Sequence, residues 1–186
     1  LDASGADFRG ADLSRCTFVE ATLDDADLRE ATLTKGLFYK CSGKDVRFDK
    51  AQAKGFLAVN ASSFPRARFT GACLDEAHLR GTSLAEANLD GAAMASADLS
   101  SCDLSGASLK RATAKGALLI RTDLSRADMR GFNGMQALLG KANLSGARVE
   151  GANLFRADLA RVQVDGDTSF VVPPLGGFTD AQDRLK

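Results

Sequence analysis

The chain lacks several of the residues and runs on which common protein classes depend. It has no tryptophan, one histidine, one tyrosine and three prolines among 186 residues. Its 24 basic and 24 acidic residues cancel, whereas bulk capture of nucleic acid requires a strong basic excess. No apolar run approaches the ~18 residues of a membrane-spanning helix, and no secretory signal is visible. We therefore expect a cytoplasmic protein with no membrane span and no nucleic-acid partner.

Catalytic and metal-binding chemistry also finds little support. The four cysteines are not spaced for a zinc clip or an obvious disulfide framework. His78 is the single imidazole, and no Ser or Cys nucleophile can be paired with it. No phosphate-binding loop of the GxxxxGK[ST] type is present. We predict a protein that is not an enzyme and that uses no cofactor and no metal.

What the chain does have is a five-residue period. A small residue stands two positions before each bulky one, often with Asp or Asn between them, as in Ala11-Asp12-Leu13. The bulky positions include Phe8, Leu13, Phe18, Leu23, Leu28, Leu33, Phe38 and Phe48, and then Phe64, Phe69, Leu74, Leu79 and Leu84.

This period suits neither a regular helix nor a flat strand. Five residues advance an α-helix by about 500°, which scatters the bulky side chains around its axis. In a strand, an odd period sends alternate side chains to opposite faces. All bulky residues can point inward only if the chain turns a corner in every repeat, which makes a coil. Stacked coils form a solenoid with one continuous core.

The repeat resembles that of the pentapeptide-repeat family, whose motif reads roughly A(D/N)LXX. The resemblance implies an all-β, right-handed quadrilateral β-helix with twenty residues per coil, hence about eight coils. We expect residues 1–164 to form this helix and residues 165–186 to form a C-terminal cap or tail. Matching segments are ADLSR (11–15), ANLDG (87–91), ADLSS (97–101), ANLSG (142–146) and ADLAR (157–161).

The array departs from its own rule in several places. The phase slips by one residue near residues 58–64, and we expect a bulge or kink at Pro65 because proline removes a ladder donor. Phe132 with Gly134, and Phe56 with Ala58, read as exchanges of the large and small positions. Gly43 has no obvious partner and suggests looser packing. Cys16, Cys41 and Cys102 occupy the small inward position, which predicts buried thiols.

Outward positions on one side of the expected rod carry apolar residues. Stacking the sequence at twenty residues per coil gathers them in two patches, one early and one late. One interpretation is ordinary surface hydrophobicity or inward packing at a distorted turn. The other is a protein-binding face, or a face that an upstream domain covers. The candidate partner-binding residues are Leu37, Tyr39, Leu57, Val59, Leu118, Ile120, Leu138, Met135 and Phe155.

Charge is distributed unevenly along the array. Residues 1–34 contain eight acids and three bases, whereas residues 110–161 contain ten bases and four acids. Arg121, Lys141 and Arg161 fall in one column beside the late patch. Such a column is commonly a solvated edge, but it could also orient an acidic partner.

These features favour a non-catalytic scaffold or adaptor with a protein partner. The run FVEATLDDADLREATLTKG (18–36) is also similar to the pentapeptide-repeat region of bacterial type VI secretion accessory proteins, which implies help in effector loading. The repeat is already running by Ala6, so we expect a piece of a longer bacterial protein. The alternatives are a topoisomerase-binding DNA mimic, which the basic late coils disfavour, and a host-directed effector. A homodimer through a coil end is a further expectation.

Overall fold

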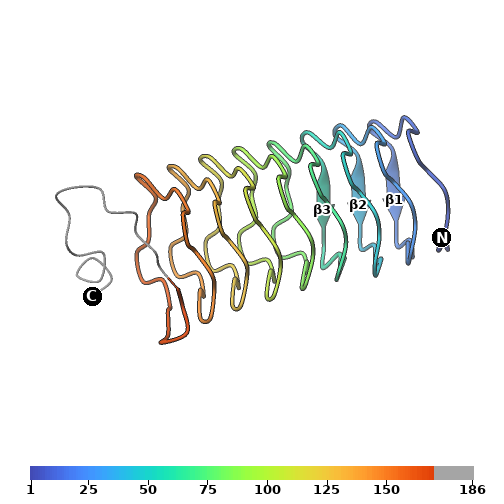
Figure 1. Cartoon of the computed structure of the whole chain (residues 1–186). Helices are drawn as coiled ribbons and strands as arrows, with labels where there is room; N and C mark the ends of the chain where they lie inside the picture. The colour runs from blue at the N-terminus through green and yellow to red at the C-terminus, as the bar shows by residue number, and fades with distance from the viewer. Residues whose placement is uncertain (170–186) are drawn as a thin grey trace.

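The computed structural model describes residues 1–169, which wind into a stack of similar coils running from one end of a rod to the other (Figure 1). Each coil lies over the previous one, and parallel β-bridges join them in four columns. We name the four sides of the rod after these columns. Face A begins at Asp2, face B at Asp7, face C at Asp12 and face D at Thr17. Within residues 1–169 the chain forms no helix.

The three named strands lie next to one another on face D. They are β1 (Thr17–Val19), β2 (Leu37–Tyr39) and β3 (Leu57–Val59), paired in parallel in the order β1-β2-β3. On the other faces a single bridged residue per coil makes the contact. A short strand is sufficient because a corner on either side turns the chain onto the next face.

One residue in every repeat has the left-handed backbone conformation on which the corner depends. Asp25, for example, has φ 57°, and the N–H of Ala26 donates to the carbonyl of Leu23 across it, at 2.9 Å. A positive φ at the third residue of such a turn is the signature of a type II turn. Three residues of each pentapeptide cross a face and two turn the corner, which is why the repeat has five residues.

The Asp or Asn of the motif anchors the turn that follows it. The carboxylate of Asp98 accepts a hydrogen bond from the N–H of Ser100 at 2.9 Å, and the amide oxygen of Asn143 accepts one from Ser145 at 3.1 Å. A short polar side chain that caps the backbone two residues ahead stabilises such turns. The polar position of the motif is therefore part of the fold.

The inward positions fill the rod completely. Alanine at the small position and Leu, Met or Phe at the bulky one are buried through most coils. The early coils contain the aromatic part of this core, where Phe48 stacks on Phe69 with ring centroids 4.5 Å apart. Phe38 meets Phe56 edge-on at 4.9 Å. The later coils use mainly Leu, Met and Ala, with Phe132 as their buried aromatic residue.

The exchanges of large and small residues are real. A Cβ atom added to Gly134 would lie 2.7 Å from Cε1 of Phe132 and 3.0 Å from Cδ2 of Leu154, so the Phe132 ring occupies the space of the missing leucine. The expectation of loose packing at Gly43 is wrong. Val46, in the small position of the next repeat, approaches it so closely that an added Cβ would clash with Val46 Cγ2.

The phase slip has a defined place. Bridges are twenty residues apart as far as the Leu37–Leu57 pair and twenty-one apart across the slip, from Ser42–Ser63 to Leu57–His78. The extra residue lies at the corner Asn60–Ala61, where both residues have positive φ, 56° and 61°. The expected kink at Pro65 is therefore wrong. Pro65 precedes Arg66, which has φ 56°, and so occupies the second position of an ordinary turn, where proline is favoured.

A row of buried donors runs along the corner between face D and the next face A. The hydroxyl of Thr82 donates to the carbonyl of Ala58 at 3.0 Å and that of Thr122 to Leu99 at 2.8 Å. The thiol of Cys102 donates to Leu79 at 2.8 Å. Each bond joins one coil to the coil before it, so this column adds side-chain hydrogen bonds to the backbone ladder.

The prediction of three buried thiols holds for two of them. Cys41 and Cys102 are buried, whereas Cys16 is exposed, because it lies in the first coil. The expected count of about eight coils and the C-terminal cap stay predictions, since residues 170–186 lie outside the described part of the chain.

The exchange at Phe132 and Gly134 predicts a specific non-additivity. Restoring the motif leucine with Gly134→Leu should lower the free energy of unfolding by ~1–3 kcal/mol through overpacking. Phe132→Ala should lower it by ~3–5 kcal/mol by leaving a cavity. The loss of unfolding free energy in the double variant should be smaller than the sum of the two single losses by ~1 kcal/mol or more. Urea denaturation of the three variants measures this difference. Strict additivity would show that the two side chains do not share one space.

The four cysteines should divide into two classes. Burial raises the pKa of the Cys102 thiol to about 12 and also raises that of Cys41, so neither should react with a thiol reagent in the folded protein. Cys16 and Cys73 should react under the same conditions, and all four after unfolding. Rapid native labelling of Cys102, located by peptide mapping, would contradict the described core.

Candidate protein-binding surface

The first apolar patch lies on the strands of face D. We define it as Val19, Leu37, Tyr39, Leu57 and Val59. Leu37 pairs with Leu57, and Tyr39 lies between Val19 and Val59 in the register of the three strands. Val19 is 53% exposed and the other four are half-buried. The structure thus brings together the four early residues that the sequence singled out, and adds Val19, as one continuous strip over three coils.

The second apolar patch lies further along the rod. We define it as Leu118, Ile120, Leu138, Met135 and Phe155. Leu118 and Leu138 are bridged neighbours on face D, and Ile120 and Leu138 are each 37% exposed. Phe155, around the corner on face C, is 63% exposed. Met135 precedes it in the same column, as the Gly116–Met135 and Gln136–Phe155 backbone bonds show.

Polar residues separate the two patches. The column that begins with Leu37 and Leu57 continues through His78 and Asp98 before it reaches Leu118 and Leu138. His78 is exposed, and the Asp98 carboxylate caps the Ser100 N–H. Face D therefore offers two distinct surfaces, not one continuous stripe.

The coil itself does not require leucine at these outward positions. Asp98 and Asp158 occupy the same column on either side of Leu118 and Leu138, and both cap the following turn. Leucine there gives up that hydrogen bond and exposes apolar surface in adjacent coils. Clustered exposed apolar side chains of this kind are typical of interaction surfaces.

The two patches differ in the charges at their margins. At the first patch, Lys40 pairs with Glu20 at 3.4 Å and Lys54 with Glu76 at 3.1 Å, whereas Lys35, at the corner beside this patch, forms no ion pair within residues 1–169. At the second patch the bases form no ion pair with any residue in the range 1–169; they are Lys115, Arg121, Lys141, Arg156 and Arg161. Arg156 instead lies over the ring of Phe155, 5.3 Å from its centroid.

Face B, on the opposite side of the rod, is covered by ion pairs. Asp128 receives two hydrogen bonds from Arg130, at 2.8 and 2.6 Å, and lies 3.7 Å from Lys110 Nζ. In the early coils, Arg29 binds Asp27 in the same two-pronged way. Sequence reasoning missed this network. Its signal is an Asp-X-Arg spacing that recurs in the stacked register.

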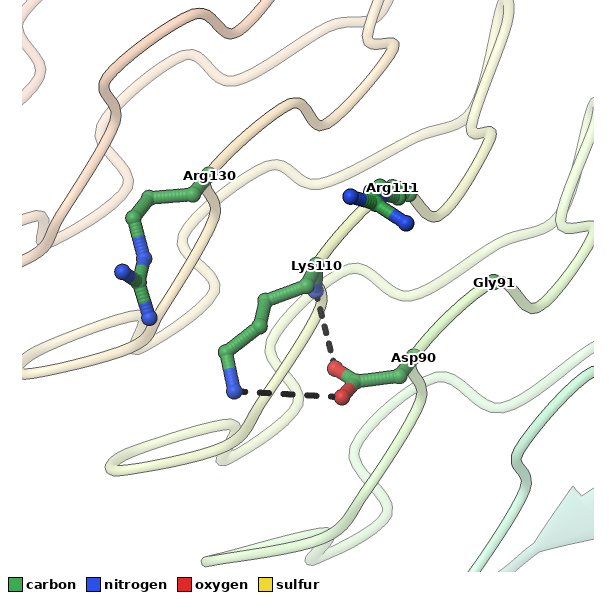
Figure 2. A pocket seen from close by; sticks show the side chains of 5 residues that line it. All are labelled: Asp90, Gly91, Lys110, Arg111 and Arg130. Atoms are coloured by element: carbon green, nitrogen blue, oxygen red, sulfur yellow. Dashed lines mark hydrogen bonds and ion pairs between the residues drawn. The ribbon is translucent and has the colours of Figure 1, made fainter.

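A shallow pocket of about 510 Å³ opens on face B, lined by Asp90, Gly91, Lys110, Arg111 and Arg130. Figure 2 shows the Lys110 side chain directed toward Asp90, with Arg130 and Arg111 on either side. The Asp90 carboxylate accepts a hydrogen bond from the Lys110 N–H at 3.0 Å and lies 3.9 Å from its Nζ. Lys110 and Arg130 are thus engaged by carboxylates, and the pocket holds no nucleophile paired with a base.

Other kinds of site find no support in the described part of the chain. Residues 1–169 contain no group of three or more His, Cys, Asp or Glu side chains that could hold a metal ion. No helix in that range is long and apolar enough to cross a membrane. The geometry defines a four-sided β-helical repeat protein whose distinctive exposed features are the two patches.

Comparison with known proteins gives the family. The model of pentapeptide repeats matches residues 2–54, 62–100, 97–133 and 135–166, in eight copies. The chain therefore belongs to the pentapeptide-repeat family, whose members fold as right-handed quadrilateral β-helices. The gap in the match at residues 55–61 coincides with the phase slip at Asn60–Ala61. No curated protein sequence matches the chain.

One solved structure supports the same fold, and a second is similar in sequence. HetL, a pentapeptide repeat protein involved in heterocyst differentiation regulation from the cyanobacterium Nostoc sp. strain PCC 7120, is 24% identical with a TM-score of 0.51. The match covers 88% of this chain and 84% of HetL. Full-length QnrB1, a plasmid-mediated fluoroquinolone resistance protein, is 21% identical over 89% of this chain and 84% of its own, with a TM-score of 0.49.

The face B network predicts loss of stability in acid. Hydrogen bonds from Arg9, Arg29 and Arg130 lower the pKa values of Asp7, Asp27 and Asp128, that of Asp7 to about 2. The ion pairs of these aspartates contribute fully to the free energy of unfolding when the pH is above 3.8, the ordinary pKa of an aspartate. This contribution is lost as the pH falls from 3.8 through the lowered pKa values of the folded protein. Asp27→Asn with Asp128→Asn should reduce stability at neutral pH and flatten its fall below pH 3.8, measured by urea denaturation.

Asp25→Asn is the matched control, because Asp25 makes no ion pair within residues 1–169 and Asn also tolerates positive φ. It should leave the acid dependence unchanged. An equal effect of the control would assign the acid loss to general charge and not to the face B pairs.

Proposed function

We propose that this protein is a non-catalytic scaffold that binds a protein partner through face D. The observation that carries the proposal is the replacement of turn-capping polar residues by Leu118 and Leu138 in adjacent coils, where Asp98 and Asp158 show that the fold accepts aspartate. Exposed apolar side chains that the fold does not require are best accounted for by a partner that covers them.

The proposal extends to the cellular role of the protein and to its partner. We propose a cytoplasmic adaptor within a larger bacterial protein, with assistance in type VI secretion effector loading as the setting that the early repeats suggest. A DNA mimic that binds topoisomerase needs a predominantly acidic surface. The excess of bases in residues 110–161 speaks against that role for the late coils. A homodimer through a coil end stays a prediction.

The test replaces the leucines by the residue that the fold itself uses in their column. Leu118→Asp with Leu138→Asp should preserve the folded state, as judged by the thermal unfolding midpoint. The same change should remove the partner that co-purifies with the wild-type chain from the source cell. The expected loss of affinity is at least tenfold, since central apolar contacts carry most of the binding energy.

The matched control is Ser63→Asp with Ser83→Asp, two bridged neighbours in the same position of face A, where the column continues to Asp103. This variant adds the same charge in adjacent coils away from face D and should retain the partner. Equal recovery of the same partner by the face D variant and by the wild type would reject the proposed surface.

A further inference from the structure

We propose that the second patch and the bases at its margins bind an acidic amphipathic segment of a protein partner. This inference rests on the proposed function and deepens it by stating the chemistry of the partner. The apolar side chains of the segment would lie over Leu118, Ile120 and Leu138, and its carboxylates would meet cations on both sides.

The cations on one margin form a regular column. Arg121, Lys141 and Arg161 stand at the same corner of three successive coils, with φ values of 58°, 62° and 59°. The N–H of Arg121 bonds the carbonyl of Gly140, and that of Lys141 bonds the carbonyl of Ala160, at 3.0 and 2.9 Å. The corner backbone is therefore fixed, and the three side chains repeat at the coil spacing of ~4.8 Å.

The opposite margin carries two more bases. Lys115 precedes Met135 and Phe155 in the end column of face C, as the successive Ser96–Lys115, Gly116–Met135 and Gln136–Phe155 bonds show. Arg156 stands at the next corner and covers part of the Phe155 ring. The apolar patch therefore has a row of three bases along one margin and two separate bases near the other.

These charges are not neutralised by the surrounding coils. Within residues 1–169, none of the five bases forms an ion pair, whereas Lys40 and Lys54 beside the first patch are paired with Glu20 and Glu76. The acids that share the Leu118–Leu138 column, Asp98 and Asp158, direct one carboxylate oxygen to their own turns. An excess of unpaired positive charge around apolar surface favours an acidic partner and speeds its encounter.

A protein segment fits this surface better than a lipid bilayer. Asp98 and Asp158 lie in line with the patch at both ends, where they would face the phosphates of an anionic membrane. The leucines are also only partly exposed, at 37% for Leu138, and would insert little. A peptide can place its apolar residues between the two aspartates and its acids over the corners.

The test selects peptides from a random display library on the immobilised full-length chain. Enriched peptides should combine net negative charge with apolar residues, and their affinity should fall as salt is raised. Arg121→Glu with Lys141→Glu should weaken the enriched peptide on the order of tenfold by fluorescence anisotropy. Glutamate fits these corners, because Glu76 and Glu86 adopt φ 57° and 58° at equivalent positions.

The control is Arg111→Glu with Arg126→Glu, which changes the same charge at corners of the other faces, with φ 56° and 58°. It should leave peptide affinity within twofold of the wild type.

Three outcomes would overturn the inference. In the first, Leu118→Asp with Leu138→Asp abolishes binding of the enriched peptides, but these peptides are basic or bind equally well to Arg121→Glu with Lys141→Glu. This result would support the binding surface on face D and reject the acidic partner. In the second, the leucine variants bind every enriched peptide as well as the wild type does, which would reject both the binding surface on face D and the acidic partner. If phosphatidylserine vesicles bind through the same residues and peptides do not, the partner is a membrane.

Discussion

The parallel backbone ladder between successive coils is the interaction on which every other feature depends. It places residue i beside residue i + 20 in the early coils, as in the Asp7–Asp27 bridge. Because one left-handed corner residue per repeat returns the chain to the next face, each side chain keeps its column along the rod. The inward side chains, mostly leucine, phenylalanine and alanine, then stack on one another, and the hydrophobic effect acts along one continuous core.

The same ladder sorts the outward side chains by face. Residues far apart in sequence become direct neighbours, so a chain with no net charge acquires a heavily charged face B and an apolar face D on opposite sides. On face B, neighbouring coils supply opposite charges, and pairs such as Lys110 with Asp128 form between them. Among residues 1–169, the late bases at the margins of the second patch have no such partners. Face B is thus covered by ion pairs among its own side chains, whereas face D and its margins expose apolar and basic side chains that are available to a partner.

Much of this arrangement could be predicted from the sequence, because the five-residue period specifies which positions point inward. The columns of Leu118 and Leu138 and the Phe132–Gly134 exchange follow from counting. The prediction was wrong where the packing or exposure of a residue depends on contacts between repeats or on its place at the end of the stack. Val46 fills the space of Gly43 from a different repeat, and Cys16 is exposed because it belongs to the first coil. The slip at Asn60–Ala61 depends on backbone angles that a proline-based rule does not capture.

The most direct test of this account is a cross-link across the slip, because the register there fixes every later column. Gln52 is bridged to native Cys73, twenty-one residues away, at a Cα separation suited to a disulfide. Oxidation of Gln52→Cys, in a background carrying Cys16→Ser, should join residues 52 and 73, with Ala53→Cys as the control that does not react. Failure of residue 52 to cross-link, with cross-linking at residue 53 instead, would contradict the register and the surfaces built on it.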